Sequence, residues 1–143
     1  SGDLSTLAPH AVAALPGVLV VGTSNGPFRS TDGGATWTVS PGESGTPVYS
    51  LHRAADGALY AGTDVGVRRS DDGGLTWGPP GAGLPVEPRY VEIGEAADGT
   101  LVTQAAGGYY FSADRGATWQ PASHPFPGAV GGFTLDAAGT LYA

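Results

Sequence analysis

The chain has 143 residues, of which 13 are acidic and 6 basic, so its formal net charge at pH 7 is −7. This length suits one domain with its own core, and the negative charge disfavours nucleic acids and anionic membrane surfaces as partners. The chain has no cysteine, which excludes disulfides and thiolate metal sites, and no apolar run approaches the ~20 residues of a membrane helix.

An eight-residue motif, Ser-x-Asp-x-Gly-x-Thr-Trp, occurs three times along the chain. The copies at 30–37, 70–77 and 112–119 begin 40 and 42 residues apart. A period of about 40 residues with internal turn signals is typical of a β-propeller blade. The shared positions are Ser30, Asp32, Gly34, Thr36 and Trp37, then Ser70, Asp72, Gly74, Thr76 and Trp77, and finally Ser112, Asp114, Gly116, Thr118 and Trp119.

Each repeat predicts four short antiparallel strands. In the second repeat we expect them at residues 48–53, 59–62, 67–70 and 76–78. Asp56-Gly57 is the signal for a two-residue hairpin in which both turn residues have positive φ. The units are predicted at 9–40, 47–79 and 89–121, with half a blade at 129–143. The prediction is an all-β chain of about three and a half four-stranded β-propeller blades, a partial or oligomer-completed propeller.

The repeated motif resembles the Asp box, also called the bacterial neuraminidase repeat. Families that carry it include sialidases, sortilin-type receptors, xyloglucanases and a photosystem II assembly factor, all built on β-propellers. The resemblance covers nearly the whole chain and implies that the motif lies on the outer rim, away from the binding face. A short carboxylate in a turn accepts bonds from nearby backbone N–H groups, so we interpret these positions as structural. A calcium site at Asp71 and Asp72 is the alternative, although few further oxygen ligands lie at suitable spacing.

A catalytic interpretation depends on acidic residues facing one cleft. A glycosidase needs two such carboxylates, and a sialidase needs three converging arginines, for which this chain has no Arg-Ile-Pro-like opening motif. The first strands of the blades supply the candidate channel residues His52, Arg53, Glu92 and Glu95. Arg53 and Glu95 fall at the same position of adjacent blades, so a structural ion pair is the simpler interpretation, with catalysis as the alternative.

A candidate ligand face lies opposite the Asp boxes, where connectors between blades and the turns between second and third strands gather. Its candidate residues are Asn25, Glu43, Asp64, Arg89 and His124. The three histidines show no metal-ligand spacing, and no phosphate-binding loop occurs. We therefore expect neither a metal nor a cofactor.

The leading hypothesis is a non-enzymatic β-propeller segment that acts as a binding or scaffold surface for a carbohydrate or protein ligand. One alternative is a fragment of a sialidase- or xyloglucanase-like glycoside hydrolase, and another is an assembly-factor propeller that docks a protein partner. The resemblance implies a secreted or periplasmic location. The chain has no methionine, which suggests a processed chain or part of a longer one. An open arc of blades leaves sheet faces bare, so we expect self-association or a larger parent chain.

Overall fold

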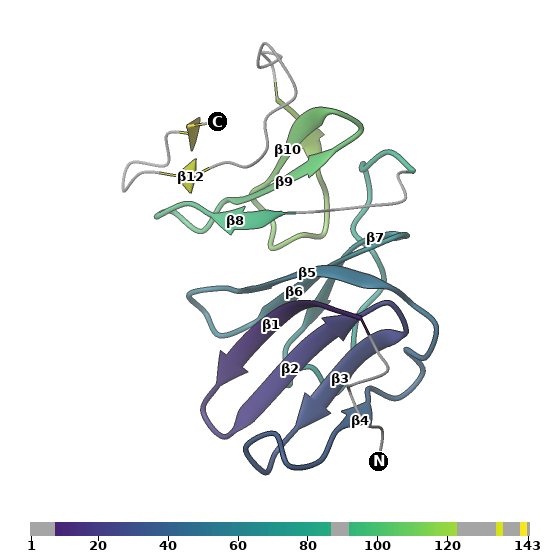
Figure 1. Cartoon of the computed structure of the whole chain (residues 1–143). Helices are drawn as coiled ribbons and strands as arrows, with labels where there is room; N and C mark the ends of the chain where they lie inside the picture. Colours follow the sequence, from purple (N-terminus) through teal and green to yellow (C-terminus); the bar gives the residue numbers. More distant parts are fainter. Residues whose placement is uncertain (1–7, 87–91, 123–133, 136–140, 143) are drawn as a thin grey trace.

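The computed structural model describes residues 8–86, 92–122, 134–135 and 141–142. These residues form antiparallel sheets that follow one another in chain order and stack face to face (Figure 1). No helix occurs in the described ranges, and hence none that is long and apolar enough to cross a membrane. Two candidate ligand residues, Arg89 and His124, lie outside the described residues.

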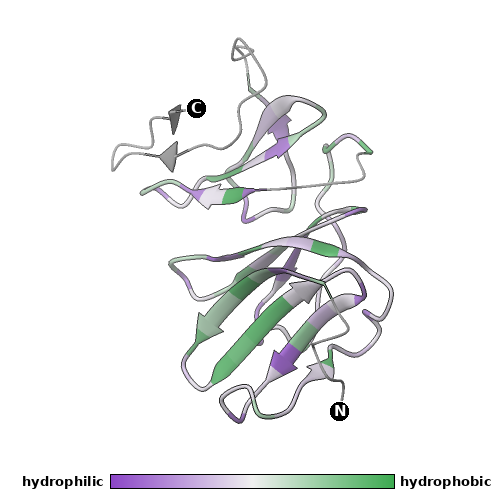
Figure 2. Ribbon diagram, viewed as in Figure 1, coloured by the Kyte–Doolittle hydropathy of each residue, from purple (hydrophilic) through white to green (hydrophobic). Residues whose placement is uncertain are grey.

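The first sheet contains four strands that pair in chain order. They are β1 (Pro9–Leu15), β2 (Val18–Thr23), β3 (Gly26–Ser30) and β4 (Thr38–Val39). The central strand β2 is apolar along most of its length (Figure 2). Such a continuous apolar strand is expected where both faces of a sheet are covered. The chain passes from β3 to β4 through the first Asp box.

The second sheet has three strands, β5 (Val48–Arg53), β6 (Leu59–Thr63) and β7 (Gly66–Ser70). They agree with the predicted first three strands to within one residue at each end. The fourth strand, expected at 76–78, is not formed as a regular strand. Backbone N–H groups of Gly78 and Gly81 donate to β7, at 2.8 and 3.0 Å. The prolines at 79 and 80 lie between these bonds and have no N–H, so a regular ladder cannot continue.

The third sheet again has four strands, in the order β11-β10-β9-β8. They are β8 (Ile93–Glu95), β9 (Leu101–Ala105), β10 (Gly108–Ser112) and β11 (Gln120–Pro121). A final antiparallel pair follows, β12 (Thr134–Leu135) with β13 (Leu141–Tyr142).

The Asp56-Gly57 turn differs from its prediction. Only Gly57 has a positive φ, of 91°, and the N–H of Gly57 donates to the carbonyl of Ala54 at 2.9 Å. The loop is therefore a β-turn closed by one left-handed glycine, a longer connection than the two-residue hairpin. Outside the Asp boxes, two consecutive positive φ values occur among the described residues in the β9–β10 turn, at Ala106 (50°) and Gly107 (73°).

The core of the described residues consists of two apolar clusters, one in each of the two gaps between the first three sheets. The first joins Ala13 and Val20 to Val48, Leu59 and Trp77 of the second sheet. The second cluster lies between β6–β7 and β9. Its members include Tyr60, Val67, Leu101, Ala105 and Trp119. In each gap the tryptophan comes from the Asp box of the later sheet. Each apolar cluster therefore holds one sheet face to face against the next.

Candidate functional site

The three Asp boxes share one set of hydrogen bonds. In the first box the hydroxyl of Thr36 donates to Asp32 Oδ2 at 2.5 Å and its backbone N–H donates to Oδ1 at 2.9 Å. Ser30 donates to the same carboxylate at 2.8 Å and accepts from the N–H of Gly34 at 2.9 Å. Asp72 and Asp114 make the corresponding bonds in the other two boxes. Each carboxylate is thus used to hold its own turn.

These bonds favour the ionised carboxylates. Hydrogen bonds from the Thr36 hydroxyl, the Thr36 N–H and Ser30 lower the pKa of Asp32 to about 2. The equivalent bonds from Thr118 and Ser112 lower the pKa of Asp114 to about 2. For Asp72 burial opposes the shift, but the bonds from Thr76 and Ser70 outweigh it and the pKa is lowered. A permanently ionised acceptor suits a turn and is a poor general acid.

In the second and third boxes the glycine and tryptophan also determine how closely two sheets approach. A Cβ placed on Gly74 would lie 2.9 Å from Val20 of the preceding sheet, and one on Gly116 would lie 3.1 Å from Tyr60. Trp77 and Trp119 are only 9% and 1% exposed, and their indole N–H groups have no hydrogen-bond partner among the described residues. In the first box Trp37 is half-buried and donates to the carbonyl of Gly34 at 2.9 Å.

The structure brings together two of the four predicted channel residues. His52 Nε2 on β5 lies 3.5 Å from Glu95 Oε2 on β8, and the same oxygen accepts the N–H of Ala55 at 2.8 Å. The expected pair of Arg53 with Glu95 is not among the ion pairs of the described residues, and Arg53 is exposed. Glu92 precedes β8, and its backbone carbonyl accepts the Thr103 hydroxyl at 2.8 Å.

The predicted ligand face is only partly available. Asn25 is exposed in the β2–β3 turn, and Asp64 is half-buried in the β6–β7 turn. Glu43 was expected to face a ligand, but it is only 6% exposed and forms an ion pair with Arg68. This expectation was wrong because a connector carboxylate reaches inward when a guanidinium on the neighbouring strand can neutralise it.

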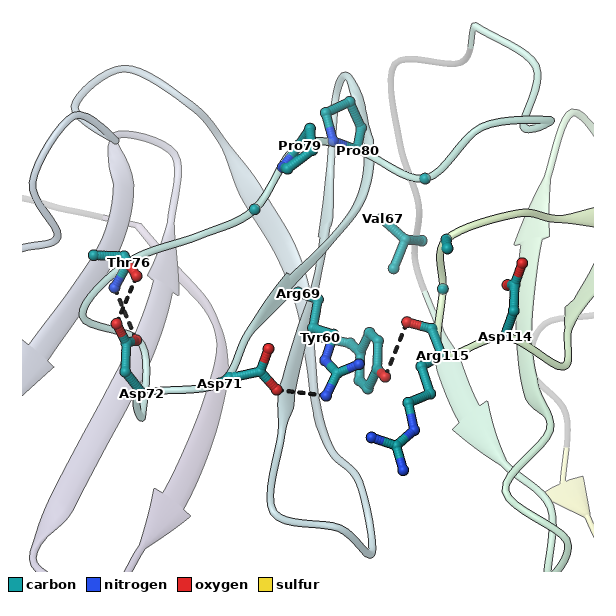
Figure 3. A pocket seen from close by; sticks show the side chains of 14 residues that line it. Tyr60, Val67, Arg69, Asp71, Asp72, Thr76, Pro79, Pro80, Asp114 and Arg115 are labelled. Carbon is teal, nitrogen blue, oxygen red and sulfur yellow. Dashed lines mark hydrogen bonds and ion pairs between the residues drawn. The ribbon is translucent and has the colours of Figure 1, made fainter.

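Two hollows lie between the second and third sheets, beside the Asp boxes. The first, of about 520 Å³, is bounded by Val67 and Arg69 of β7, by the connector at 78–81, and by residues 114–117 (Figure 3). The second, of about 530 Å³, lies between the turns at 54–56 and 96–99. Among the residues that the structure describes, only Tyr60 and Arg115 line both hollows.

A charged cluster separates the two hollows. Arg69 Nη2 lies 2.5 Å from Asp71 and 3.7 Å from Asp56, and Arg115 Nη1 also lies 3.7 Å from Asp56. The Arg69 guanidinium stands 5.9 Å from the centre of the Tyr60 ring, within range of a cation–π contact. The Tyr60 hydroxyl donates to the Arg115 carbonyl at 3.1 Å (Figure 3). These contacts connect the second sheet to the Asp box of the third.

This cluster was not among the predicted functional sites, although the repeats contain a signal for it. Arg115 occupies the position at which the other two boxes have Gly33 and Gly73. Tyr60 similarly stands where the first and third repeats have valine. The two departures from the repeat therefore mark the interface between the second and third sheets, which differs from the interface between the first and second. Among the described residues, no group of three or more His, Asp or Glu side chains is arranged to hold a metal ion.

Comparisons with known proteins agree with the repeat and the fold. The model of the BNR/Asp-box repeat matches residues 28–39. An ancestral GH74 enzyme is 20% identical with a TM-score of 0.76, over 93% of this chain and 21% of that chain. YCF48 bound to D1 peptide is 16% identical with a TM-score of 0.71, over 99% of this chain and 48% of that one. The extracellular domain of a one-component system from B. thetaiotaomicron is 14% identical with a TM-score of 0.72, over 93% and 20%.

These likenesses confirm the Asp-box resemblance and the partial β-propeller fold. The chain carries the Asp-box repeat and has the fold of a partial β-propeller built from successive antiparallel sheets. It spans between about a fifth and a half of the lengths of the three structures described above. The search of curated proteins found no significant match. At such low identities the structural likeness establishes the fold alone.

Proposed function

We propose that this chain is a non-enzymatic propeller segment whose ligand is a protein, bound along the hollows between the second and third sheets. One observation carries the proposal: each acidic residue that lines the hollows is already held by donors of the chain itself. Asp56 accepts the N–H of Ala58 at 3.0 Å, Glu95 that of Ala55 at 2.8 Å, and Asp98 that of Thr100 at 2.9 Å. In the first hollow Asp71 pairs with Arg69, while Asp72 and Asp114 hold their Asp boxes.

The lining supports a protein ligand better than a carbohydrate. Within the described part of the chain, Tyr60 is the only aromatic residue that lines either hollow, and it is 1% exposed. The described lining therefore offers no open ring on which a sugar could stack. The Arg115 side chain is 68% exposed and can form charged hydrogen bonds with a polypeptide. The likeness to YCF48 bound to a peptide supports this choice at the level of fold.

A binding assay with paired arginine variants tests the proposal. Arrays of extended peptides and of glycans are probed with the intact chain, with Arg115→Ala, and with Arg53→Ala as the matched control. Arg53 is exposed on β5 and lines neither hollow. We expect binding to peptides, weakened about tenfold by Arg115→Ala and unchanged by Arg53→Ala. Binding confined to the glycan array, or equal effects of the two variants, would contradict the proposal.

The second candidate is a fragment of a glycoside hydrolase. It is favoured by the three carboxylates of Asp56, Glu95 and Asp98 around one hollow, because such enzymes use paired carboxylates. Against it, hydrogen bonds from Thr100 lower the pKa of Asp98, whereas a general acid needs a raised pKa. Xyloglucan and fluorogenic glycosides serve as substrates, with Glu92→Gln and Glu95→Gln as variants. Turnover that disappears in Glu95→Gln would establish the enzyme.

We further propose that the chain functions outside the cytoplasm. Support comes from the likeness to an extracellular domain and from the Asp-box resemblance. Fractionation of cells that express the natural gene would locate the protein. Recovery in the cytoplasmic fraction alone would overturn this proposal.

A further inference from the structure

The interface between the second and third sheets contains a titratable pair on its inner strands. His52 Nε2 of β5 lies 3.5 Å from Glu95 Oε2 of β8, and the two side chains are only 24% and 15% exposed. The same Glu95 oxygen accepts the N–H of Ala55 at 2.8 Å, which holds the carboxylate against the second sheet. His52 Nε2 is buried and has no hydrogen-bond partner among the described residues. The contact therefore joins two sheets through a nitrogen whose hydrogen bonding is not satisfied.

The first interface has an apolar residue at the position equivalent to His52. The register pairs Ala13 with Val20 across β1 and β2, and His52 with Tyr60 across β5 and β6. Val20 and Tyr60 occupy the same position of successive repeats. Ala13 is 8% exposed and belongs to the apolar cluster of the first gap. The histidine is thus a further departure from the repeat, at the interface that the two hollows flank.

Protonation changes what this pair can do. A neutral imidazole carries a proton on one of its two nitrogens, whereas the imidazolium ion donates from both. A charge-assisted N–H···O bond is about 2.7–2.9 Å long and stronger than a neutral one. The present separation of 3.5 Å is too long for such a bond, and a small movement of either side chain closes it. The cation satisfies the buried Nε2 and draws β5 and β8 together.

Charged residues of the third sheet favour the cation. Glu95 faces His52 from β8, and Glu92 lies just before the same strand. On β5 itself the adjacent residue is Arg53, whose side chain points to the opposite face because strand residues alternate. The nearest charge on the face that carries His52 is therefore the carboxylate of Glu95.

Tyr60, the partner of His52 on β6, experiences the same electrostatic environment. Burial raises the pKa of Tyr60, and the charge of Arg69 on β7 opposes this rise. Three carboxylates add to it, those of Asp56, Asp71 and Glu95. Arg69 also lies close to Asp71 and Asp56, which offset its positive charge. The surroundings of the imidazole on the second sheet therefore contain acidic groups as well as one guanidinium.

We propose that the His52–Glu95 contact is a pH-sensitive latch between the second and third sheets. An ordinary histidine gains its proton near about pH 6.5, and protonation of His52 closes the latch. The closed interface holds this proton more tightly than the opened one, so the third sheet opens less in acid and more as the pH rises. Glu95 also lines the second hollow, so the latch holds one wall of that hollow in place.

Native-state hydrogen exchange at about pH 5.5 and about pH 7.5 tests the latch, because histidine titrates between these values and ordinary carboxylates do not. After correction for intrinsic exchange rates, we expect the opening constant of β9 amides to rise about tenfold over this range. His52→Gln and Glu95→Gln should abolish the rise, because each variant removes one charge of the pair. His10→Gln and His124→Gln replace the other two histidines of the chain and should retain it.

Two results would overturn the latch. One is an opening constant of the wild-type chain that stays the same or falls as the pH rises. The other is a rise that persists in His52→Gln, which would assign the pH dependence to another group. If His52→Gln does not fold, Glu95→Gln decides, because glutamine keeps the size of the side chain and carries no charge. All measurements are made without a ligand, so the outcome is independent of whether the hollows bind a protein.

Discussion

Arg115 has a left-handed backbone at a position where the other two Asp boxes have glycine. Its φ is 59°, compared with 73° for Gly33 and 71° for Gly73. A side chain with a Cβ is disfavoured there by roughly 1–2 kcal/mol. The hydrogen bond from Tyr60 to its carbonyl and the neighbouring Asp56 help to hold it in place. A strained residue on the boundary of two hollows is consistent with a role in binding.

Replacement of Arg115 separates backbone strain from side-chain contacts. Arg115→Gly removes both the guanidinium and the strain, whereas Arg115→Ala removes only the guanidinium. We expect Arg115→Gly to be more stable than Arg115→Ala by about 1 kcal/mol, because glycine adopts this φ without a steric cost. Urea denaturation of the two variants measures the difference. Equal stability would show that the left-handed backbone at position 115 is not strained.

The aspartates of the Asp boxes predict a local response to acid. Since the pKa of Asp114 is lowered from 3.8 to about 2, its ionised form contributes fully to stability above pH 3.8. That contribution is lost as the pH falls through about 2. Thr118→Val removes the strongest hydrogen bond, so we expect the pKa of Asp114 to rise towards 3.8. Carboxyl ¹³C titration by NMR measures it, and Thr36→Val should shift Asp32 instead. A pKa of Asp114 near 2 in both variants would be contrary to this account.

At the scale of elements, the Asp-box glycine controls the distance between sheets. Gly74 has a φ of 80° and lies where a Cβ would come within 2.9 Å of Val20. Gly33 has a similar φ, 73°, with nothing within 4 Å of its Cβ position. The two glycines therefore differ in packing while sharing their backbone conformation.

This pair allows a matched mutational test. Gly33→Ala is expected to cost about 1 kcal/mol from the left-handed φ alone. Gly74→Ala adds overpacking against Val20, for a further cost of about 1–3 kcal/mol. Thermal or urea unfolding of the two variants provides the comparison. If Gly74→Ala were no worse than Gly33→Ala, close approach would not be the reason for glycine at this position.

Local patterns in the sequence were sufficient to predict the first three strands of the second sheet, but not its fourth strand. The strands β5, β6 and β7 agree with their predicted ranges to within one residue, because hydrophobic runs bounded by Gly and Asp turns are determined locally. The fourth strand of the second sheet was predicted wrongly, since Pro79 and Pro80 interrupt the ladder that the motif spacing suggested. The prediction of a two-residue hairpin at Asp56-Gly57 was also wrong, because the dipeptide alone does not determine loop length.

The candidate site depended on contacts that no local pattern contains. Glu43 and Arg68 are 25 residues apart and meet only because the connector folds over β7. His52 displaced Arg53 as the partner of Glu95, since adjacent strand residues point to opposite faces and the offset between sheets decides which one is near. The hollows arise from the arrangement of two sheets around Tyr60 and Arg115. Only the departure of these two residues from the repeat was visible in the sequence.

At the scale of the molecule, the two gaps between the first three sheets are not equivalent. The first is closed by an apolar cluster, by the Arg68–Glu43 pair, and by a hydrogen bond of 2.5 Å from Ser40 to the Gly74 carbonyl. The second has its own apolar cluster but is flanked by the two hollows. Fewer packed atoms on one side of an interface weaken its dispersion contacts. The third sheet should therefore separate from its neighbour more readily than the first.

Native-state hydrogen exchange measures this difference directly. We expect the amides of β9 and β10 to exchange through openings of lower free energy than those of β2 and β6, because local stability follows local packing. Tyr60→Phe removes the hydroxyl that donates to Arg115 and should lower protection in β10 further while leaving β2 unchanged. Uniform protection across the three sheets would mean that they open as one unit. A third sheet that opens alone would instead give a protein ligand a way to enter between the blades, which connects the weaker gap to the proposed binding site.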